Sequence, residues 1–218
     1  MLSVEISPGV FILEAEGQKR LATRSDDAMP VYGERILEGY RIWDPFRSKL
    51  AALLLKGRSK RPVLARDALV LYLGAATGTT VSHVSDIVRD GLVYAVEFSP
   101  RSMRDLIRLC ERRKNIVPIL ADAARPEEYA FLVEPVDLVY QDVAQRNQAD
   151  IASRNCARYL KFGGELILML KTRSVDVTAS PQAVLQAEKE NLKGLETMPA
   201  MDLLPFHHDH FALQAKKP

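Results

Sequence analysis

Short apolar runs alternate with amphipathic segments along the chain between residues 68 and 191. The runs predict strands at 69–73, 92–97, 116–120, 137–141 and 164–170. The segments between them carry apolar residues three and four positions apart, which predicts helices at 80–89, 100–113, 147–160 and 181–191. Strand–helix alternation of this kind is typical of an α/β fold in which helices cover both faces of a parallel sheet.

The first 55 residues follow a different pattern. Apolar residues between Val4 and Leu13 are interrupted by Pro8-Gly9, and a polar break follows at 25–27, which predicts short strands and turns. Such a meander has a limited core, so we expect it to pack on the main domain or on a partner. The sequence therefore predicts a small N-terminal β-rich domain at 1–55 and a main domain at 56–218.

A helix is predicted to begin at Asp44-Pro45, with the acid as N-cap and the proline at the first helical position. Phe46 and the leucines that follow would form its apolar face, and Lys49 would lie off that face. The basic run 56–61 is predicted to be a linker into the main domain.

The turn after the first strand of the main domain contains Gly74 and Gly78. Glycines let the backbone turn sharply and approach a ligand closely, and Thr79 and Thr80 can cap the next helix and donate hydroxyls to a bound group. The spacing is G-x-x-x-G, so the dinucleotide fingerprint G-x-G-x-x-G and the phosphate-binding P-loop are both absent. This spacing disfavours an NAD-linked enzyme.

Glu97 ends the second strand about 20 residues after Gly74, where a carboxylate is placed to accept both hydroxyls of an adenosine ribose. A glycine turn and such an acid, without a phosphate site, favour S-adenosylmethionine (SAM). A glycine turn in another kind of α/β protein would share these features, so both interpretations stay open on these two residues alone.

Ligands of parallel sheets bind at the carboxyl ends of the strands, so the strand ends form the candidate site. The residues there are Gly74, Glu97, Asp122, Asp142 and Lys171. Asp122 is placed to accept from an adenine amino group. Lys171 is costly to bury unless it is paired, and Asp142 ends the adjacent element. The two form either a structural ion pair or a catalytic pair, and their place in the cleft favours catalysis.

The predicted helix after Glu97 carries a stripe of basic residues on one face: Arg101, Arg104, Arg108 and Arg112, with Arg113 and Lys114 beside them. A stripe of this kind fits a surface that faces phosphates. An acidic protein partner would suit it equally, and a solvated helix face is the third interpretation.

The sequence His207-His208-Asp209-His210 suggests a zinc site at first sight. Adjacent residues of an extended segment point to opposite faces, however, and structural zinc usually has cysteine ligands. We therefore predict no metal site, and expect one histidine to point into the cleft.

The net charge of +2 does not by itself indicate nucleic acid, so any such role must rest on local patches. No apolar run reaches about 18 residues, so no membrane span is expected. The N-terminus lacks the basic region and apolar core of a signal peptide. With two cysteines in apolar helical contexts, the sequence predicts a soluble intracellular protein.

Several longer segments occur in the order found in one known family: VYGERI, YRIWDPFRSKLAA, LYLGAATGTTVSHVSDIV, VYAVEFSPRSMRDL, NIVPILADAARPEEY, VDLVYQDVAQRNQADI, LKFGGELILMLKTRSVDVT and DH near the end. On these segments the sequence resembles fibrillarin in its short archaeal form over nearly the whole chain. The resemblance implies a Rossmann-like, SAM-dependent methyltransferase with a mixed seven-stranded sheet, which methylates ribose 2′-hydroxyls of rRNA and tRNA.

The resemblance also implies particular site residues. SAM would be bound at Gly74, Thr79, Thr80, Glu97, Phe98, Asp122, Ala123, Asp142, Val143, Ala144 and Gln145. Related ribose methyltransferases use a Lys-Asp-Lys-acid arrangement, which corresponds here to Lys49, Asp142, Lys171 and His210. The family often has Glu at the position of Gln141, which lies outside the expected contacts.

The resemblance further implies a box C/D guide ribonucleoprotein. Its other members would be a Nop5/Nop56/Nop58-type scaffold protein, a kink-turn-binding ribosomal-type protein, and a guide RNA that pairs with the target. Two alternatives stay open: a SAM-dependent methyltransferase acting on protein glutamine, whose signal would resist RNase, and a module that retains SAM as a structural ligand. The charges at the strand ends argue against the second alternative.

Overall fold

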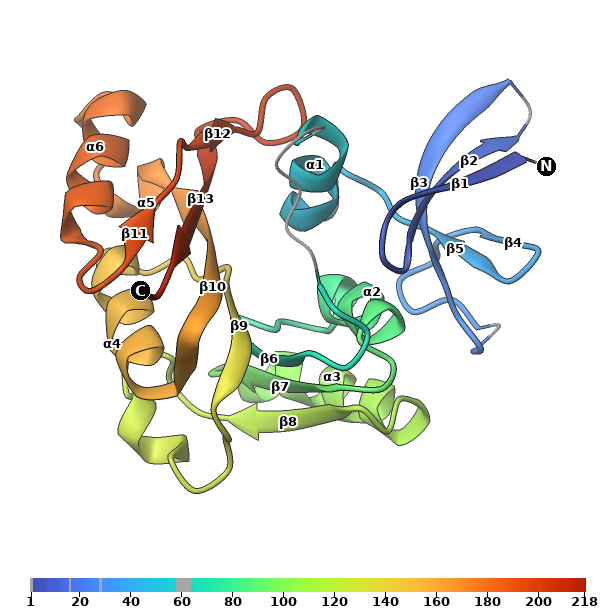
Figure 1. The fold of residues 1–218 in the computed structure, drawn as a ribbon, viewed down its shortest axis with the longest axis horizontal. Helices are drawn as coiled ribbons and strands as arrows, with labels where there is room; N and C mark the ends of the chain where they lie inside the picture. Colours follow the sequence, from blue (N-terminus) through green and yellow to red (C-terminus); the bar gives the residue numbers. More distant parts are fainter. Residues whose placement is uncertain (1, 16, 28, 58–63) are drawn as a thin grey trace.

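The structure is a computed structural model that describes residues 2–15, 17–27, 29–57 and 64–218. A small N-terminal sheet lies beside a larger α/β unit (Figure 1). Most of the predicted basic linker, residues 58–61, lies outside the described residues, and the predicted domain boundary at residue 55 falls just before them. In the ranges given above, every helix is too short or too polar to cross a bilayer.

The N-terminal sheet has five antiparallel strands in the order β1-β2-β3-β5-β4. They are β1 (Leu2–Ser7), β2 (Val10–Ala15), β3 (Gln18–Arg24), β4 (Ile36–Leu37) and β5 (Tyr40–Ile42). The predicted meander is therefore confirmed. As expected for so small a sheet, it packs on the larger unit, with buried Val10, Leu21 and Trp43 joining the main hydrophobic core.

Helix α1 (Lys49–Lys56) begins later than the sequence predicts. Asp44 Oδ1 accepts the N–H of Phe46 at 2.9 Å, which folds Asp44 and Pro45 into a turn instead of a helix start. Ser48 is the N-cap, and its Oγ accepts the N–H of Ala51 at 3.3 Å. Phe46 consequently lies outside the helix and is 63% exposed, whereas Leu50, Leu53 and Leu54 are buried.

The larger sheet has eight strands in the order β11-β13-β10-β9-β6-β7-β8, with β12 also paired to β13. They are β6 (Leu69–Leu73), β7 (Leu92–Glu97), β8 (Ile116–Leu120), β9 (Val136–Gln141), β10 (Leu160–Lys171), β11 (Glu196–Thr197), β12 (Met201–Asp202) and β13 (His210–Lys216). Strands β6 to β10 are parallel, as predicted, and β13 runs antiparallel to β10.

The expected seven-stranded sheet is thus an eight-stranded one, because two short strands share one edge. Both β11 and β12 pair with β13, on either side of an interruption that contains Pro199. Proline has no N–H to donate, so it breaks the ladder at that point.

Helices cover both faces of the larger sheet, as predicted. They are α2 (Thr79–Ile87), α3 (Pro100–Arg112), α4 (Gln148–Tyr159), α5 (Thr172–Val175) and α6 (Pro181–Asn191), with a 3₁₀ turn η1 (Pro126–Tyr129). Alternate side chains of β6 point to opposite faces. Val70 and Tyr72 join the core beneath α1, α2 and α3, while Leu71 and Leu73 join the core beneath α4.

A buried charge network fastens the N-terminal sheet to the larger unit. The carboxylate of Asp86 in α2 accepts Arg41 Nη1 at 2.7 Å, Arg113 Nη1 at 2.5 Å and Thr23 Oγ1 at 2.7 Å. Arg41 is fully buried and also pairs with Glu34. Removing one partner of such a buried set costs about 3–5 kcal/mol, because the remaining charge is left uncompensated. The network therefore fixes how the two sheets are placed.

His83 completes this interface from α2. Its ring is fully buried and stacks on Trp43, with centroids 4.6 Å apart and planes 11° apart. Nδ1 lies 2.7 Å from Thr23 Oγ1 and Nε2 lies 2.8 Å from the Tyr32 hydroxyl. Burial lowers the pKa of His83 well below its ordinary value, and the positive charges of Arg41 and Arg113 lower it further.

We predict that His83 makes the folded protein less stable in mild acid. The unfolded chain binds a proton at this histidine below a pH of about 6.5, whereas the folded chain does not. Its contribution to the free energy of unfolding is therefore complete above that pH and is lost as the pH falls. Urea unfolding at pH 7.5 and pH 5.5 measures this loss.

The variant His83→Gln should show a smaller difference between the two pH values than the wild type. His208 is exposed and serves as the matched control, so His208→Gln should keep the wild-type difference. An unchanged pH dependence in His83→Gln would contradict the assignment.

Candidate active site

A cavity of about 470 Å³ opens at the carboxyl ends of the parallel strands. Its walls come from the turns that follow β6, β7, β8 and β9. They include most of the residues that the sequence assigned to SAM: Gly74, Glu97, Phe98, Asp122, Ala123, Asp142, Val143, Ala144 and Gln145. Four of the five strand-end residues that the sequence pattern selected are therefore brought together here, whereas Lys171 does not line this cavity.

Gly74 makes the closest approach between two of these turns. Its φ is +85°, a conformation that side chains rarely allow, and its N–H donates to Val96 O at 2.9 Å. A Cβ at this position would clash with the backbone carbonyl of Asp142 and crowd Val143. Only glycine lets the turn after β6 pass so close to the end of β9.

Glu97 is a buried carboxylate, and each of its two oxygens accepts a backbone N–H. Oε1 accepts the N–H of Ser99 at 2.8 Å and Oε2 accepts the N–H of Ala76 at 2.8 Å. A carboxylate oxygen has room for a further hydrogen bond. Glu97 is therefore fixed in place and can still accept two hydroxyl groups from a ligand.

The opposite wall combines polar and aromatic groups. Asp122 Oδ1 accepts the N–H of Ala124 at 2.9 Å and Nε2 of Gln145 at 3.1 Å. Gln145 Oε1 is buried and has no hydrogen-bond partner within the described part of the chain. Phe98 lines the cavity and is 72% exposed. This wall offers an open acceptor and an exposed ring to a planar polar ligand.

Thr79 and Thr80 do not line this cavity. The N-cap of α2 is Gly78, which forms no side-chain cap, so the expected capping role of the threonines is wrong. Thr80 is buried, and its hydroxyl donates to Ser48 Oγ at 2.9 Å, which connects α2 to the start of α1. Thr79 lines a different depression, beside Tyr32 and Arg108.

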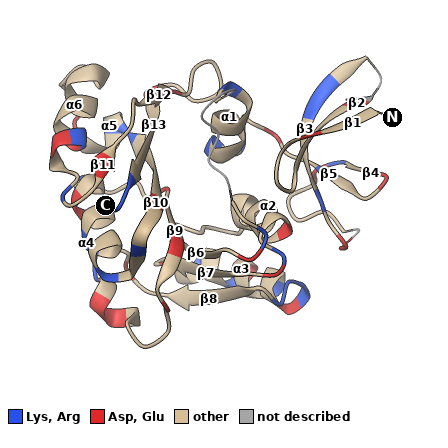
Figure 2. Ribbon diagram, viewed as in Figure 1, with Lys and Arg blue, Asp and Glu red and all other residues tan. Residues whose placement is uncertain are grey.

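Lys49 forms the ion pair that closes one side of the site. Its ammonium donates to both carboxylate oxygens of Asp142, at 2.6 and 2.8 Å. The sequence pattern suggested Lys171 as the partner of Asp142, and the structure corrects this. Helix α1 begins at Lys49 and brings that ammonium to the end of β9 (Figure 2 shows basic residues at both ends of α1).

Lys171 and His210 lie opposite each other at the ends of β10 and β13. In the described ranges, the ammonium of Lys171 has no hydrogen-bond or ion-pair partner. His210 Nδ1 lies 2.6 Å from the carbonyl oxygen of His208. Burial lowers the pKa of His210; the His208 carbonyl opposes that shift and the charge of Lys49 reinforces it. All four residues assigned to catalysis by resemblance therefore lie in one region.

Gln148 is a site residue that the sequence analysis did not identify. It is fully buried, its Oε1 accepts the N–H of Lys171 at 3.0 Å, and its Nε2 donates to Lys171 O at 3.1 Å. Its own carbonyl accepts Nε2 of Gln141 at 2.7 Å. These bonds connect the end of β9, where Asp142 follows, to the end of β10. The one sequence signal for Gln148 was its position: a polar residue on the buried side of the helix predicted at 147–160, near its start.

The histidine-rich segment is a turn, not the extended segment that the sequence suggested. Residues 204–209 fold back before β13 starts at His210, so the His207 and His210 rings lie 5.8 Å apart. His207 Nε2 lies 2.8 Å from Pro45 O, which joins this turn to the one before α1. Across the described residues, no group of three or more His, Cys, Asp or Glu side chains could hold a metal ion.

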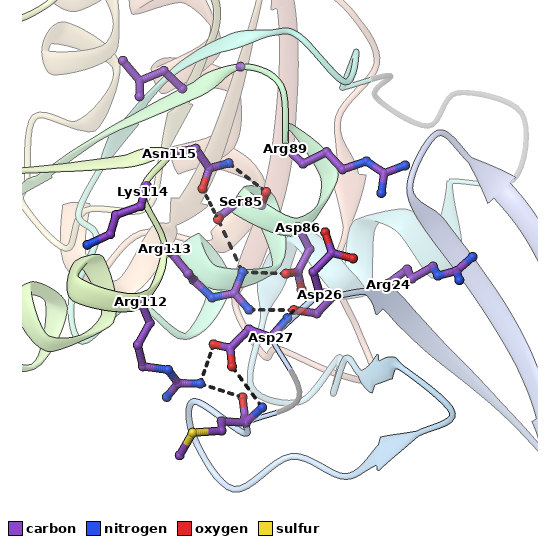
Figure 3. A pocket seen from close by; sticks show the side chains of 14 residues that line it. Arg24, Asp26, Asp27, Ser85, Asp86, Arg89, Arg112, Arg113, Lys114 and Asn115 are labelled. Carbon is purple, nitrogen blue, oxygen red and sulfur yellow. Dashed lines mark hydrogen bonds and ion pairs between the residues drawn. The ribbon is translucent and has the colours of Figure 1, made fainter.

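A second cavity, of about 820 Å³, lies at the other end of the parallel strands, between the N-terminal sheet and the ends of α2 and α3 (Figure 3). Arg112 pairs with Asp27, and Arg113 is buried against Asp86. Arg113 therefore does not belong to a phosphate-facing stripe. Arg112 lies in the last turn of α3, and Arg89 and Lys114 follow the ends of α2 and α3, where positive charge stabilises the helix dipole. Arg112 and Arg113 of this basic cluster therefore serve the contact with the N-terminal sheet and its loops.

The strand order, the glycine turn after β6 and the acid at the end of β7 define the Rossmann-like methyltransferase fold. The chain belongs to the fibrillarin family: the profile of that family, described as "Fibrillarin", matches residues 2–218. It is 54% identical to the fibrillarin-like rRNA/tRNA 2′-O-methyltransferase of Methanothrix thermoacetophila over 213 residues, covering 98% of each chain.

Solved structures agree with this assignment. A chain of a fibrillarin/Nop5p complex superimposes with a TM-score of 0.92 at 43% identity, covering 99% of this chain and 100% of that one. Aeropyrum pernix fibrillarin with natively bound S-adenosyl-L-methionine superimposes with a TM-score of 0.86 at 45% identity, covering 98% and 99%.

We predict that Gly74→Ala strongly destabilises the protein. The substitution adds the left-handed backbone penalty of about 1–2 kcal/mol and the cost of crowding, about 1–3 kcal/mol, so the free energy of unfolding should fall by about 3 kcal/mol. Urea denaturation measures it. Gly194 also has positive φ, +68°, but an added Cβ there would meet nothing within 4 Å. Gly194→Ala should therefore cost only about 1–2 kcal/mol, and an equal loss in both variants would argue against the clash.

Proposed function

We propose that this chain is a SAM-dependent RNA 2′-O-methyltransferase that modifies riboses of rRNA and tRNA. The proposal is supported by relatives that carry this activity in their names and cover nearly the whole chain. The structural observation that carries it is the ion pair between Lys49 and Asp142 at the wall of the strand-end cavity, with Lys171 and His210 beside it. Charged groups in such a cleft are typical of catalysis.

The cavity fits SAM by the chemistry of its walls. Glu97 can accept the two ribose hydroxyls, Asp122 can accept from the adenine amino group, and the exposed Phe98 ring can stack on the base. The unpaired Oε1 of Gln145 is a buried acceptor that a bound polar group would satisfy. Gly74 leaves the space that a side chain would fill.

When bound, SAM supplies a methyl group on a positively charged sulfur, which is a good leaving group for in-line transfer to an oxygen. The protein must position the ribose 2′-oxygen and remove its proton. Lys171, whose ammonium has no partner among the described residues, is placed to stabilise the negative charge that develops on that oxygen. The ammonium of Lys49 holds the carboxylate of Asp142 in place through two hydrogen bonds. From there Asp142 would orient the methyl donor in the cavity and the ammonium of Lys171.

His210 is the candidate acceptor of the hydroxyl proton. Its Nδ1–H donates to the carbonyl of His208, which leaves a lone pair on Nε2. Burial, the largest influence, lowers its pKa, so the ring is neutral near pH 7. A neutral imidazole with one free nitrogen is a suitable general base at that pH.

We further propose that the protein works in a box C/D guide ribonucleoprotein. A solved fibrillarin/Nop5p complex supports a Nop5/Nop56/Nop58-type scaffold as partner. A kink-turn-binding ribosomal-type protein and a guide RNA paired with target rRNA or tRNA would complete the assembly, and we place it in the cytoplasm. These further members rest on the resemblance of the sequence.

The direct test is transfer of labelled methyl groups from SAM to a target RNA. We expect methylation of one guide-paired ribose when the chain is combined with scaffold protein, kink-turn protein and guide RNA. Lys171→Ala should lower the rate at least about 100-fold, because one stabilising donor is removed. Calorimetry should show unchanged SAM binding.

Two outcomes would contradict the proposal. Full turnover by Lys171→Ala would remove Lys171 from the mechanism. A label that appears in protein and resists RNase, with none in RNA, would favour the glutamine methyltransferase alternative.

Gln148 should act as a positioning residue for Lys171. Gln148→Leu keeps the bulk of the side chain but loses both hydrogen bonds to the Lys171 backbone. A displacement of about 1 Å can cost about 100-fold, so kcat should fall by that order while the Kd of SAM stays constant. The exposed Gln186 of α6 provides a matched control, and Gln186→Leu should leave kcat unchanged. Equal kcat in both variants would exclude the positioning role.

A further inference from the structure

Two phenyl rings form an exposed pair beside the candidate active site. Phe46 belongs to the turn before α1 and Phe206 to the turn before β13, and their ring centroids lie 5.1 Å apart in an edge-to-face arrangement. The contact between His207 Nε2 and Pro45 O, at 2.8 Å, holds the two turns together. Phe206 packs on the main core, but Phe46 keeps 63% of its surface exposed. The Phe46 ring is thus packed against Phe206 and remains largely exposed.

Basic side chains share a groove with this pair. Phe46 and Phe206 line a groove of about 590 Å³, between α1 and the N-terminal sheet, together with Lys19, Arg20 and Arg47. Within the described ranges, none of these three cations pairs with a carboxylate. Arg47 donates to the carbonyl of Tyr32 at 3.0 Å and lies 5.4 Å from the centre of its ring. Basic residues also mark the ribbon of β3 near its start (Figure 2).

The acids of this groove are already engaged. Glu34 pairs with the buried Arg41, and Asp44 Oδ1 accepts the N–H of Phe46. The groove is lined by four basic residues, Lys19, Arg20, Arg35 and Arg47, against two acids, so it presents an excess of positive charge around an open aromatic ring. Aromatic rings beside basic side chains are the usual surface for a nucleic-acid strand, because bases stack on the rings while cations hold the phosphates.

The aromatic pair lies near the catalytic cluster, although none of the four residues of that cluster lines the groove. Arg47 precedes Lys49 by two residues, and His207, next to Phe206, has its ring 5.8 Å from that of His210. Burial, with the Lys49 charge as the next cause, lowers the pKa of His207. A strand bound on the ring pair would therefore lie near Lys49 and His210.

We propose that Phe46, Phe206 and Arg47 form a docking platform for the RNA strand that carries the target ribose. A base next to the target nucleotide stacks on Phe46, and Arg47 contacts a backbone phosphate. This inference rests on the proposed function and adds a substrate subsite to it. An RNA strand matches both the flat ring and the surplus cations, whereas an apolar protein segment would match the rings alone.

The test compares platform variants in the reconstituted guided methylation reaction. Phe46→Ala and Phe206→Ala should each raise the KM for target RNA about tenfold, the scale of one lost stacking contact. Phe46→Trp keeps a stacking surface and should restore the KM. Arg47→Ala should raise the KM and lower the slope of log KM against log salt by about 0.7, since one phosphate contact is lost.

Two matched controls lie away from the platform. Phe131 is fully exposed beside η1, and Arg158 of α4 lies over Tyr159, 5.8 Å from its ring centre, much as Arg47 lies over Tyr32. Phe131→Ala and Arg158→Ala should leave the KM unchanged. The Kd of SAM, measured by calorimetry, should stay constant in every variant.

Crosslinking separates this inference from the proposed function, because it needs no turnover. RNA with 4-thiouridine beside the target nucleotide should crosslink to Phe46 or Phe206 in the assembled complex, and less so in Phe46→Ala. Crosslinks at these residues without methyl transfer would keep the platform and reject the enzyme assignment.

Unchanged KM values in the variants and no crosslink at Phe46 or Phe206, with wild-type turnover, would overturn the platform alone. The platform would also be overturned if Phe46→Ala no longer co-eluted with the scaffold protein while RNA crosslinks at other residues stayed unchanged. That result would assign the surface to a protein partner.

Discussion

The carboxylate of Asp86 is the interaction on which the placement of the active site depends. It binds Arg41 from the N-terminal sheet, Arg113 from the end of α3, and the Thr23 hydroxyl, all in a buried interface. Buried charges are tolerated only when every partner is in place, so this network admits one arrangement of the two sheets. Lys49 follows the N-terminal sheet in the chain, and Asp142 belongs to the larger one. Their ion pair forms because the two units are fixed to each other.

The same placement explains why residues outside the sheet complete the site. Ser48 caps α1 and also accepts the hydroxyl of Thr80 in α2, so the first turn of α1 is anchored to the turn region after β6. Phe46 precedes this cap and remains outside the helix. The turn before β13 then packs against it through Phe206 and His207. The candidate catalytic cluster and the proposed aromatic platform thus both depend on where α1 begins.

The SAM cavity has a different origin, in the parallel sheet itself. Consecutive parallel strands end at one edge of the sheet, so Gly74, Glu97, Asp122 and Asp142 meet there. Their meeting does not depend on the N-terminal sheet or on α1. Backbone groups then hold the acids in place, as the two N–H groups on Glu97 show. This part of the site is built from local turns. The catalytic part instead needs contacts between residues far apart in the chain, such as Lys49 with Asp142.

The sequence by itself determined the strands β6 to β9, the helices between them, the glycine turn and the acids at the strand ends. These features follow from local periodicity and chain order, which also fix that parallel strands end together. The tertiary structure alone decided that Asp142 pairs with Lys49 and not with Lys171, that Gln148 holds the end of β10, and that Arg113 is buried. A sequence pattern states which residues are charged or apolar. It contains no distances between elements. Because a charged side chain pairs with the opposite charge that lies nearest in space, its partner cannot be read from the pattern.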